Sequence, residues 1–236
     1  MTSVKTLTSY IDVNRLIDAP DSAHVLRIAM ATDDMAVANF CMRNALPECT
    51  FFPREMRRGA WLYFLRLQFG HLYEGVQAVR AIETTNWLNG YISRLATEAQ
   101  DAYAMLLRCT CKGTPESQEF ERVVGRVRHN TAFHYADAKS CKLIEKSTKV
   151  LATKLGDRKA KLTRGMEMSR WRFDIADDIL LNALWHEIWN LPTDITEAEL
   201  KLQATRYTTY AYELSIGLLT FAEHLVCSYC EYWTGC

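Results

Sequence analysis

The sequence predicts an all-α protein, a multi-helix bundle of about six to eight helices. Only five prolines and ten glycines occur in 236 residues, which is unusual for a loop-rich all-β fold or for a chain with long disordered linkers. Apolar residues recur at the helical period along most of the chain, and alternating strand patterns are essentially absent. A chain that is 49% apolar can bury a sizeable core, so we expect a single domain over residues 1–236.

The first half of the chain contains three expected helices. Residues 22–45 carry apolar residues at roughly the helical period, and Leu46-Pro47 ends that segment. A long amphipathic run extends from Pro53 to about Thr84, and a third helix is expected from Thr85 to Arg108. Glycine lowers helix propensity by about 1 kcal/mol. The glycines inside the second helix therefore mark close helix–helix contacts or a bend: Gly59, Gly70 and Gly75.

A loop, CTCKGT, separates the third helix from a fourth. Thr114 is suited to cap the fourth helix, with Pro115 at its first position. A fifth helix is expected from Asp137 to Leu155. The stretch that follows, GDRKAKLTRGMEMSRWRF, has the weakest helical pattern in the chain. We expect it to form a basic loop or a short hairpin.

Two more helices complete the predicted bundle. Residues 175–190 have a helical pattern, and Thr196 and Glu199 have the spacing of a capping box. The capping box predicts a last long helix that continues toward Trp233.

The net charge of zero conceals an asymmetry along the chain. Overall neutrality gives no global basic signature of a nucleic-acid-binding protein. Residues 142–172, however, contain ten Lys or Arg against three acids, whereas residues 173–236 contain two against ten. The basic segment is either a solvated surface, as helices often have, or a strip that attracts phosphates.

Neither a leader nor a membrane span is expected. The N-terminus lacks a basic segment followed by an apolar run. The apolar stretch from Leu214 to Ala222 is far shorter than the ~20 residues that a transmembrane helix needs. We therefore expect a soluble, cytoplasmic protein that does not bind a membrane.

Two pairs of cysteines have spacings that invite a metal interpretation, CTC at Cys109 and Cys111 and CSYC at Cys227 and Cys230. Structural zinc usually uses paired knuckles on tight turns, whereas CSYC lies in an apolar, aromatic helical pattern. Because free cysteine is among the most buried residue types, we interpret these residues as buried thiols. The sequence thus predicts neither a metal site nor another cofactor.

The most distinctive short segment is RHNTAFHY, Arg128 to Tyr135. On an ideal helix Asn130 and His134 share a face, whereas Arg128 lies about 240° from His134. Spacing alone favours a helix C-terminus whose cations complement the helix dipole. The alternative is a chemical site in which Arg128 and His134 meet through the long arginine side chain, a helix distortion or a second copy of the chain.

The same segment resembles the active motif of the HEPN superfamily, the higher eukaryote and prokaryote nucleotide-binding domains. That motif is Arg, four to six residues, then His, and here it consists of Arg128, five residues and His134, with His129 after the arginine. A bacterial subgroup with a segment close to RNKVAFHYD matches further, at Ala132, Phe133 and Tyr135. The chain departs from that subgroup at His129, where the subgroup has Asn, and at Asp137, which lies one residue late.

The resemblance extends to FLRLQFGHLYEGVQAV and RFDIADDIL, so it covers residues 53–190. It implies a four-helix core of HEPN type, with N-terminal helices in residues 1–50 and the long helix of residues 195–234 packed on that core. It also implies a homodimer that brings two Arg/His sets into one cleft. Many members of the superfamily are metal-independent ribonucleases of toxin–antitoxin, phage-defence and RNA-processing systems.

The residue chemistry fits such a ribonuclease. His134 can take a proton from a ribose 2′-hydroxyl or give one to the leaving oxygen, and Arg128 can hold the phosphate. His129 and Asn130 are supporting residues that can orient His134 or bind a phosphate oxygen. Tyr135 either supports the site or simply packs its ring.

The implied partners are RNA, a second copy of the chain and an antitoxin protein. The basic segment contributes candidate residues that steer RNA toward the cleft: Arg158, Lys159, Lys161, Arg164, Arg170 and Arg172. Two alternatives remain. One is a non-catalytic HEPN-like helical module that binds RNA, a nucleotide or a protein partner, and the other is a plain helical scaffold.

Overall fold

The computed structural model describes residues 10–46, 54, 56–131, 138–156 and 174–234, without the side chains of 138–140 and 174. Every regular element among them is a helix, so the all-α prediction is confirmed. Nine continuous helices are present in these residues, against about six to eight expected. The two short helices, α1 (Val13–Asp18) and α4 (Asn86–Ile92), account for the larger number.

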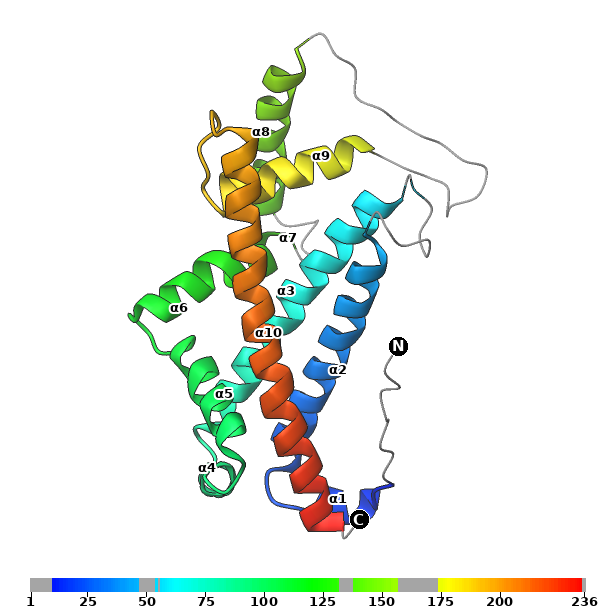
Figure 1. Ribbon diagram of the computed structural model, residues 1–236, viewed down its shortest axis with the longest axis vertical. Coiled ribbons are helices and arrows are strands. Elements are labelled where there is room, and N and C mark those ends of the chain that lie inside the picture. The colour runs from blue at the N-terminus through cyan, green and yellow to red at the C-terminus, as the bar shows by residue number, and fades with distance from the viewer. Residues whose placement is uncertain (1–9, 47–53, 55, 132–137, 157–173, 235–236) are drawn as a thin grey trace.

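Three long helices form the centre of the molecule (Figure 1). α2 (Ser22–Asn44) and α3 (Arg57–Ile82) pack along each other, and α10 (Glu197–Thr234) crosses them. α5 (Thr97–Arg108) packs against α10 and α3. α8 (Ala138–Leu155) and α9 (Asp174–Asn182) pack together at one end of the molecule, and α1 contacts α10 at the other end.

The expected helix over residues 85–108 is divided into α4 and α5, which corrects the sequence prediction. The chain leaves helical geometry after Ile92 and resumes it at Thr97. The Gln100 side chain stabilises this break, because its amide nitrogen donates to the carbonyl oxygens of Ser93 at 3.2 Å and Leu95 at 2.8 Å. These side-chain contacts satisfy carbonyls that a continuous helix would have used internally.

Two helix starts have the capping residues that the sequence predicts. Thr114 accepts a hydrogen bond from the Ser117 amide at 3.2 Å at the start of α6 (Pro115–Phe120). At the start of α10, the Thr196 amide donates to Glu199 Oε2 at 3.1 Å, and the Glu199 amide donates to Thr196 Oγ1 at 3.3 Å. The reciprocal pair is a capping box, and the bonds from Thr196 lower the pKa of the Glu199 carboxyl.

The helix that begins at Pro115 continues to Thr131 but contains a π-helical segment, η1 (Glu121–Gly125), before α7 (Arg126–Thr131). α9 likewise continues into a second π-helical segment, η3 (Ala183–Ile188). The residue that follows η3 contacts η1, because the indole nitrogen of Trp189 donates to the Val123 carbonyl at 3.2 Å. That bond satisfies a buried backbone oxygen in η1.

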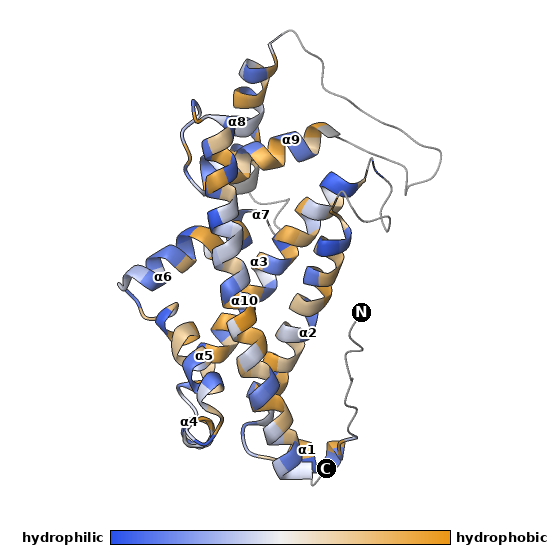
Figure 2. Cartoon of the chain, viewed as in Figure 1, coloured by the Kyte–Doolittle hydropathy of each residue, from blue (hydrophilic) through white to orange (hydrophobic). Residues whose placement is uncertain are grey.

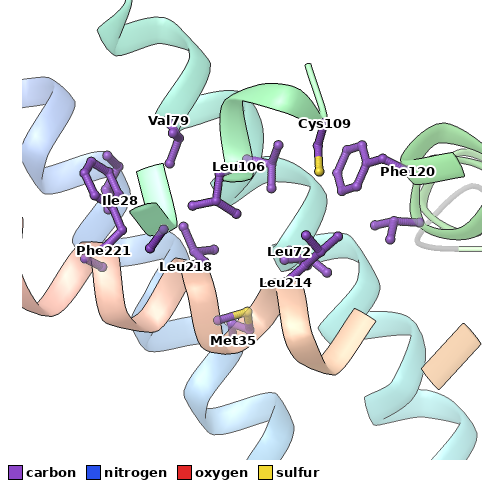
Figure 3. Close-up of a cluster of buried hydrophobic side chains, with 14 of the residues drawn as sticks. Ile28, Met35, Leu72, Val79, Leu106, Cys109, Phe120, Leu214, Leu218 and Phe221 are labelled. Carbon is purple, nitrogen blue, oxygen red and sulfur yellow. The ribbon is translucent and has the colours of Figure 1, made fainter. Parts of the chain in front are cut away.

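Apolar side chains from α1 to α10 join in one core cluster. Figure 3 shows its centre, where Ile28 of α2, Val79 of α3 and Phe221 of α10 converge. Hydrophobic residues are concentrated around the middle of α10, where it crosses the other helices (Figure 2). α2, which lies within residues 1–50, joins the core through Val25, Ile28 and Met35.

Gly75 allows α3 and α10 to approach closely, as expected for the glycines of this helix. A Cβ atom at Gly75 would collide with the buried Leu218 side chain. We expect Gly75→Ala to lower the free energy of unfolding by about 1–2 kcal/mol, because overpacking costs about 1–3 kcal/mol and alanine regains up to about 1 kcal/mol of helix propensity. Urea denaturation measures this change.

Gly90→Ala is the matched control for Gly75→Ala. Gly90 lies within α4, and its Cβ atom would meet no atom within 4 Å. This variant should therefore gain up to about 1 kcal/mol from helix propensity alone. An equal stabilisation by both substitutions would contradict close packing at Gly75.

Candidate functional site

The candidate motif begins in the last turn of α7, which holds Arg128, His129 and Asn130. His134 and Tyr135 lie outside the described residues, as do all six predicted RNA-steering residues of the basic segment: Arg158, Lys159, Lys161, Arg164, Arg170 and Arg172. The structure therefore shows the geometry around the first half of the motif, residues 128–131. This part of the site is built by three elements: α3, η1 and α7.

Arg128 is held by a carboxylate from α3. Glu74 Oε1 accepts from Nη2 of Arg128 at 2.8 Å and from Nε at 3.0 Å. The guanidinium carbon also lies 5.8 Å from the centroid of the Tyr73 ring. The Arg128 side chain is 33% exposed and that of Glu74 is 54% exposed, so this ion pair contributes at most about 1 kcal/mol to stability.

His129 lies beside Arg128. Its Nδ1 is 3.4 Å from Arg128 Nη1, and its Nε2 is 3.8 Å from Glu121 Oε1. Because a guanidinium can only donate, Nδ1 acts as the acceptor and the ring proton is placed on Nε2, toward Glu121. The carboxylates of Glu74 and Glu121 therefore flank the pair that Arg128 and His129 form.

Tyr73 forms the apolar side of this cluster. Its ring stacks on Phe120 with centroids 5.7 Å apart, and the edge contact with His129 has centroids 5.0 Å apart. Burial, followed by the negative charge of Glu121, raises the pKa of the Tyr73 phenol. The phenol is therefore neutral at physiological pH. The Tyr73 ring thus contacts the Phe120 ring, the His129 ring and the Arg128 guanidinium.

Asn130 faces another part of the molecule. Its amide nitrogen donates to the Arg126 carbonyl at 2.7 Å. Asn130 and Thr131 line a mostly apolar pocket of about 340 Å³ between α7, α8 and α9, with Leu143, Ile179 and Leu180 among the other lining residues. Of the three motif residues that are described, only Arg128 and His129 are therefore brought together.

The π-helical segment η1 brings Glu121 to the site. The Glu121 carboxylate lies against Gly125, where a Cβ atom would collide with it. Any side chain at position 125 would displace the carboxylate that faces His129. Sequence reasoning missed Glu121, Tyr73 and Glu74. A glycine inside an otherwise regular helix next to the motif was the available signal for η1.

Another histidine, His186 in η3, has a structural role. Lys154 Nζ lies 2.9 Å from its Nε2, and its Nδ1 lies 2.9 Å from the Leu191 carbonyl oxygen. Lysine can only donate, so Nε2 accepts and Nδ1 donates. The imidazole, which is 7% exposed, thereby satisfies the backbone at the end of the π-helical segment.

The prediction of buried thiols is correct for Cys109 and wrong for Cys111 and Cys227, which are exposed. Burial raises the pKa of the Cys109 thiol to about 11. Cys111 is exposed because it lies in the turn after α5, outside the core. In the part of the chain that the structure describes, no three His, Cys, Asp or Glu side chains gather in a way that would hold a metal.

Comparisons with family models, with curated proteins and with solved structures gave no match to this chain. Among the described helices, none is both long enough and apolar enough to cross a membrane. The motif and the residues that surround its first half therefore carry the functional proposal.

Proposed function

We propose that this chain is a metal-independent endoribonuclease of HEPN type that acts as a toxin or a phage-defence effector. The observation that carries the proposal is the pairing of Arg128 with His129 on a partly exposed surface, at the end of the helix that leads into RHNTAFHY. The Arg128 guanidinium can donate to phosphate oxygens, and His129 can donate to the same phosphate when both of its ring nitrogens are protonated. Both side chains remain accessible, at 33% and 44% exposure.

The proposed reaction is attack of a ribose 2′-hydroxyl oxygen on the adjacent phosphorus. The bond to the 5′-oxygen breaks, and the products carry a 2′,3′-cyclic phosphate and a 5′-hydroxyl. His134 takes the proton of the 2′-hydroxyl, and His134 of a second copy gives a proton to the leaving oxygen. Arg128 stabilises the negative charge that builds on the phosphate oxygens.

Glu74 keeps Arg128 in position before RNA binds. Two nitrogens of the guanidinium contact a single oxygen of Glu74, so Nη1 remains on the side of His129. Arginine has five N–H donors, and those directed toward His129 can bind a phosphate while the contact with Glu74 persists. In this arrangement Glu74 orients the arginine and does not block it.

Arg128→Ala should lower the rate of RNA cleavage in EDTA by about 10²–10³-fold, the usual effect of removing one donor from a developing oxyanion. The partly exposed ion pair contributes little to stability, so the variant should fold, as circular dichroism checks. Product ends should show the cyclic phosphate. Arg27→Ala removes an exposed arginine of α2 and should leave the rate unchanged.

Equal cleavage by wild type and Arg128→Ala would exclude Arg128 from the reaction and point to a contaminating nuclease. Cleavage that depends on a divalent ion and stops in EDTA would contradict the metal-independent chemistry. The same purified wild-type and Arg128→Ala proteins serve for both measurements, cleavage in EDTA and cleavage with a divalent ion.

The pairing of Arg128 with Glu74 also favours a second candidate, the non-catalytic HEPN-like module that binds RNA, a nucleotide or a protein partner. In that case Glu74 neutralises Arg128 permanently, and the motif serves packing. Wild-type protein that binds RNA but cleaves neither structured nor unstructured substrates would identify this function.

Several partners belong to the same proposal. A homodimer would supply the second His134, and an antitoxin protein would restrain the activity of a toxin. The basic residues between positions 158 and 172 would steer RNA, and a cytoplasmic location would give access to it. Size-exclusion chromatography with light scattering measures the dimer directly.

A further inference from the structure

A second, electropositive pocket lies beside the motif. It has a volume of about 580 Å³ and is bounded by α3, the turn after α5, α6, η1 and α7. Its charged lining residues are Arg80, Lys112, Arg122, Arg126 and Glu121. Four cations line the pocket with one carboxylate, and Glu119 pairs with one of the four, Arg122, so the pocket retains a net positive charge.

Three of these cations are exposed and available to a ligand: Arg80, Lys112 and Arg126. Arg122 is already engaged, since it donates to Glu119 at 2.6 and 2.8 Å and to the Tyr207 hydroxyl at 2.8 Å. Arg80 and Lys112 are exposed, and no carboxylate within the described ranges pairs with either side chain. Lys112 precedes Gly113, whose φ of 85° turns the chain at this point.

Three of the neutral donors that line the pocket are occupied by local contacts. The Thr110 hydroxyl donates to the Leu107 carbonyl at 2.8 Å, the Ser117 hydroxyl to the Thr114 carbonyl at 3.3 Å, and the Gln118 amide to the Gly113 carbonyl at 3.4 Å. The charged groups therefore dominate what the pocket can offer to a ligand. A pocket dominated by cations suits a phosphate backbone more than a base edge.

The pocket is continuous with the motif. Tyr73 and Glu121 line the pocket and also contact or face His129. Tyr73 and Arg80 both line the pocket from α3, and because they are seven residues apart they share one face of the helix, about 10.5 Å apart along its axis. The Arg128 guanidinium carbon lies 5.8 Å from the centroid of the Tyr73 ring. A chain of phosphates can therefore pass from Arg80 and Lys112 over Tyr73 to Arg128.

We propose that this pocket, through Arg80, Lys112 and Arg126, binds the phosphate backbone of single-stranded RNA next to the phosphate that is cleaved. The identity of the polyanion rests on the proposed ribonuclease function. Because the contacts are ionic, the pocket increases affinity for any RNA sequence and does not select a base. Arg126 keeps one contact of its own, a bond to the Ile188 carbonyl at 3.3 Å, which fixes its direction.

The test is the affinity of a fluorescent single-stranded RNA that carries 2′-O-methyl groups at every position and so cannot be cleaved. Arg80→Glu combined with Lys112→Glu should weaken binding about 30–100-fold at low salt. The slope of log affinity against log salt should fall by about 0.7 for each phosphate that the variant no longer binds. Arg80→Gln with Lys112→Gln should weaken binding less, because it removes charge without adding repulsion.

The matched control is Arg27→Glu with Arg94→Glu. It changes the net charge by the same amount at two exposed arginines that do not line the pocket. Affinity that falls for the pocket variant and not for the control supports the pocket. An equal decrease in both, or no decrease in either, overturns it.

Cleavage of unmodified RNA by the same proteins separates this inference from the proposed function. Binding that requires the pocket in a protein that does not cleave RNA would support the pocket and overturn the nuclease. Cleavage by a wild type whose pocket variant binds normally would support the nuclease and overturn the pocket. A wild type that neither binds nor cleaves RNA overturns both.

Discussion

His134→Ala should lower the rate of RNA cleavage about 10²–10⁴-fold, the usual contribution of a general acid or base. The effect should exceed that of removing a supporting residue, because the reaction needs one proton removed and another supplied. The assay is cleavage of unmodified RNA in EDTA, with rates compared at equal protein concentrations. Far-ultraviolet circular dichroism on both proteins reports whether the helices are intact.

His224→Ala is the control for His134→Ala. His224 lies on α10 with its Nε2 3.7 Å from Glu98 Oε1, and it contributes nothing to the motif. This variant should cleave RNA at the wild-type rate. If His134→Ala also cleaves at that rate, the activity belongs to a contaminant or to another site, and His134 has no place in the mechanism.

Phe221→Ala should lower the free energy of unfolding by about 3–5 kcal/mol, which is a large part of the stability of a typical domain. Phe221 of α10 is fully buried in the core (Figure 3). Its ring stacks on that of Tyr103 of α5, with centroids 5.1 Å apart. Alanine would leave a cavity among helices that cannot close fully around it.

Ile216→Ala on the same helix is the control, because the Ile216 side chain is 43% exposed. Its substitution should change stability by less than about 1 kcal/mol. Urea denaturation, followed by circular dichroism, measures the unfolding midpoint of each variant. If the dependence of the unfolding free energy on urea concentration is the same for both, the difference between their midpoints reports the difference in stability. A small effect of Phe221→Ala, equal to that of Ile216→Ala, would contradict the packing of α10 against α5.

Helix positions were largely predictable because their signals are local. The helical period located α2 and α3, and Thr114 and Thr196 marked two helix starts through bonds to the next turn. The break between α4 and α5 was missed. It depends on the Gln100 side chain, which reaches back to carbonyls five and seven residues earlier.

The site was predictable only in part. RHNTAFHY singled out Arg128 and His129 because a rare combination of residue types can be recognised without a fold. Glu74 is 54 residues from Arg128 in the chain, and no sequence period connects them. The position of Glu121 depends on the π-helical segment, which forms where η1 packs against Trp189.

Local patterns in the sequence were sufficient to predict the all-α class, most helix ends and the segment that carries the candidate chemistry, because each depends on residues within a few turns of one helix. Three features could be found only in the folded protein. Glu74 binds Arg128, the Tyr73 ring contacts His129, and Arg80 and Lys112 line a pocket together with Arg126. The packing of α3 against η1 and α7 creates these contacts. The side chains come from α3, from α7 and from the turn after α5, and only the burial of the apolar faces brings these segments together.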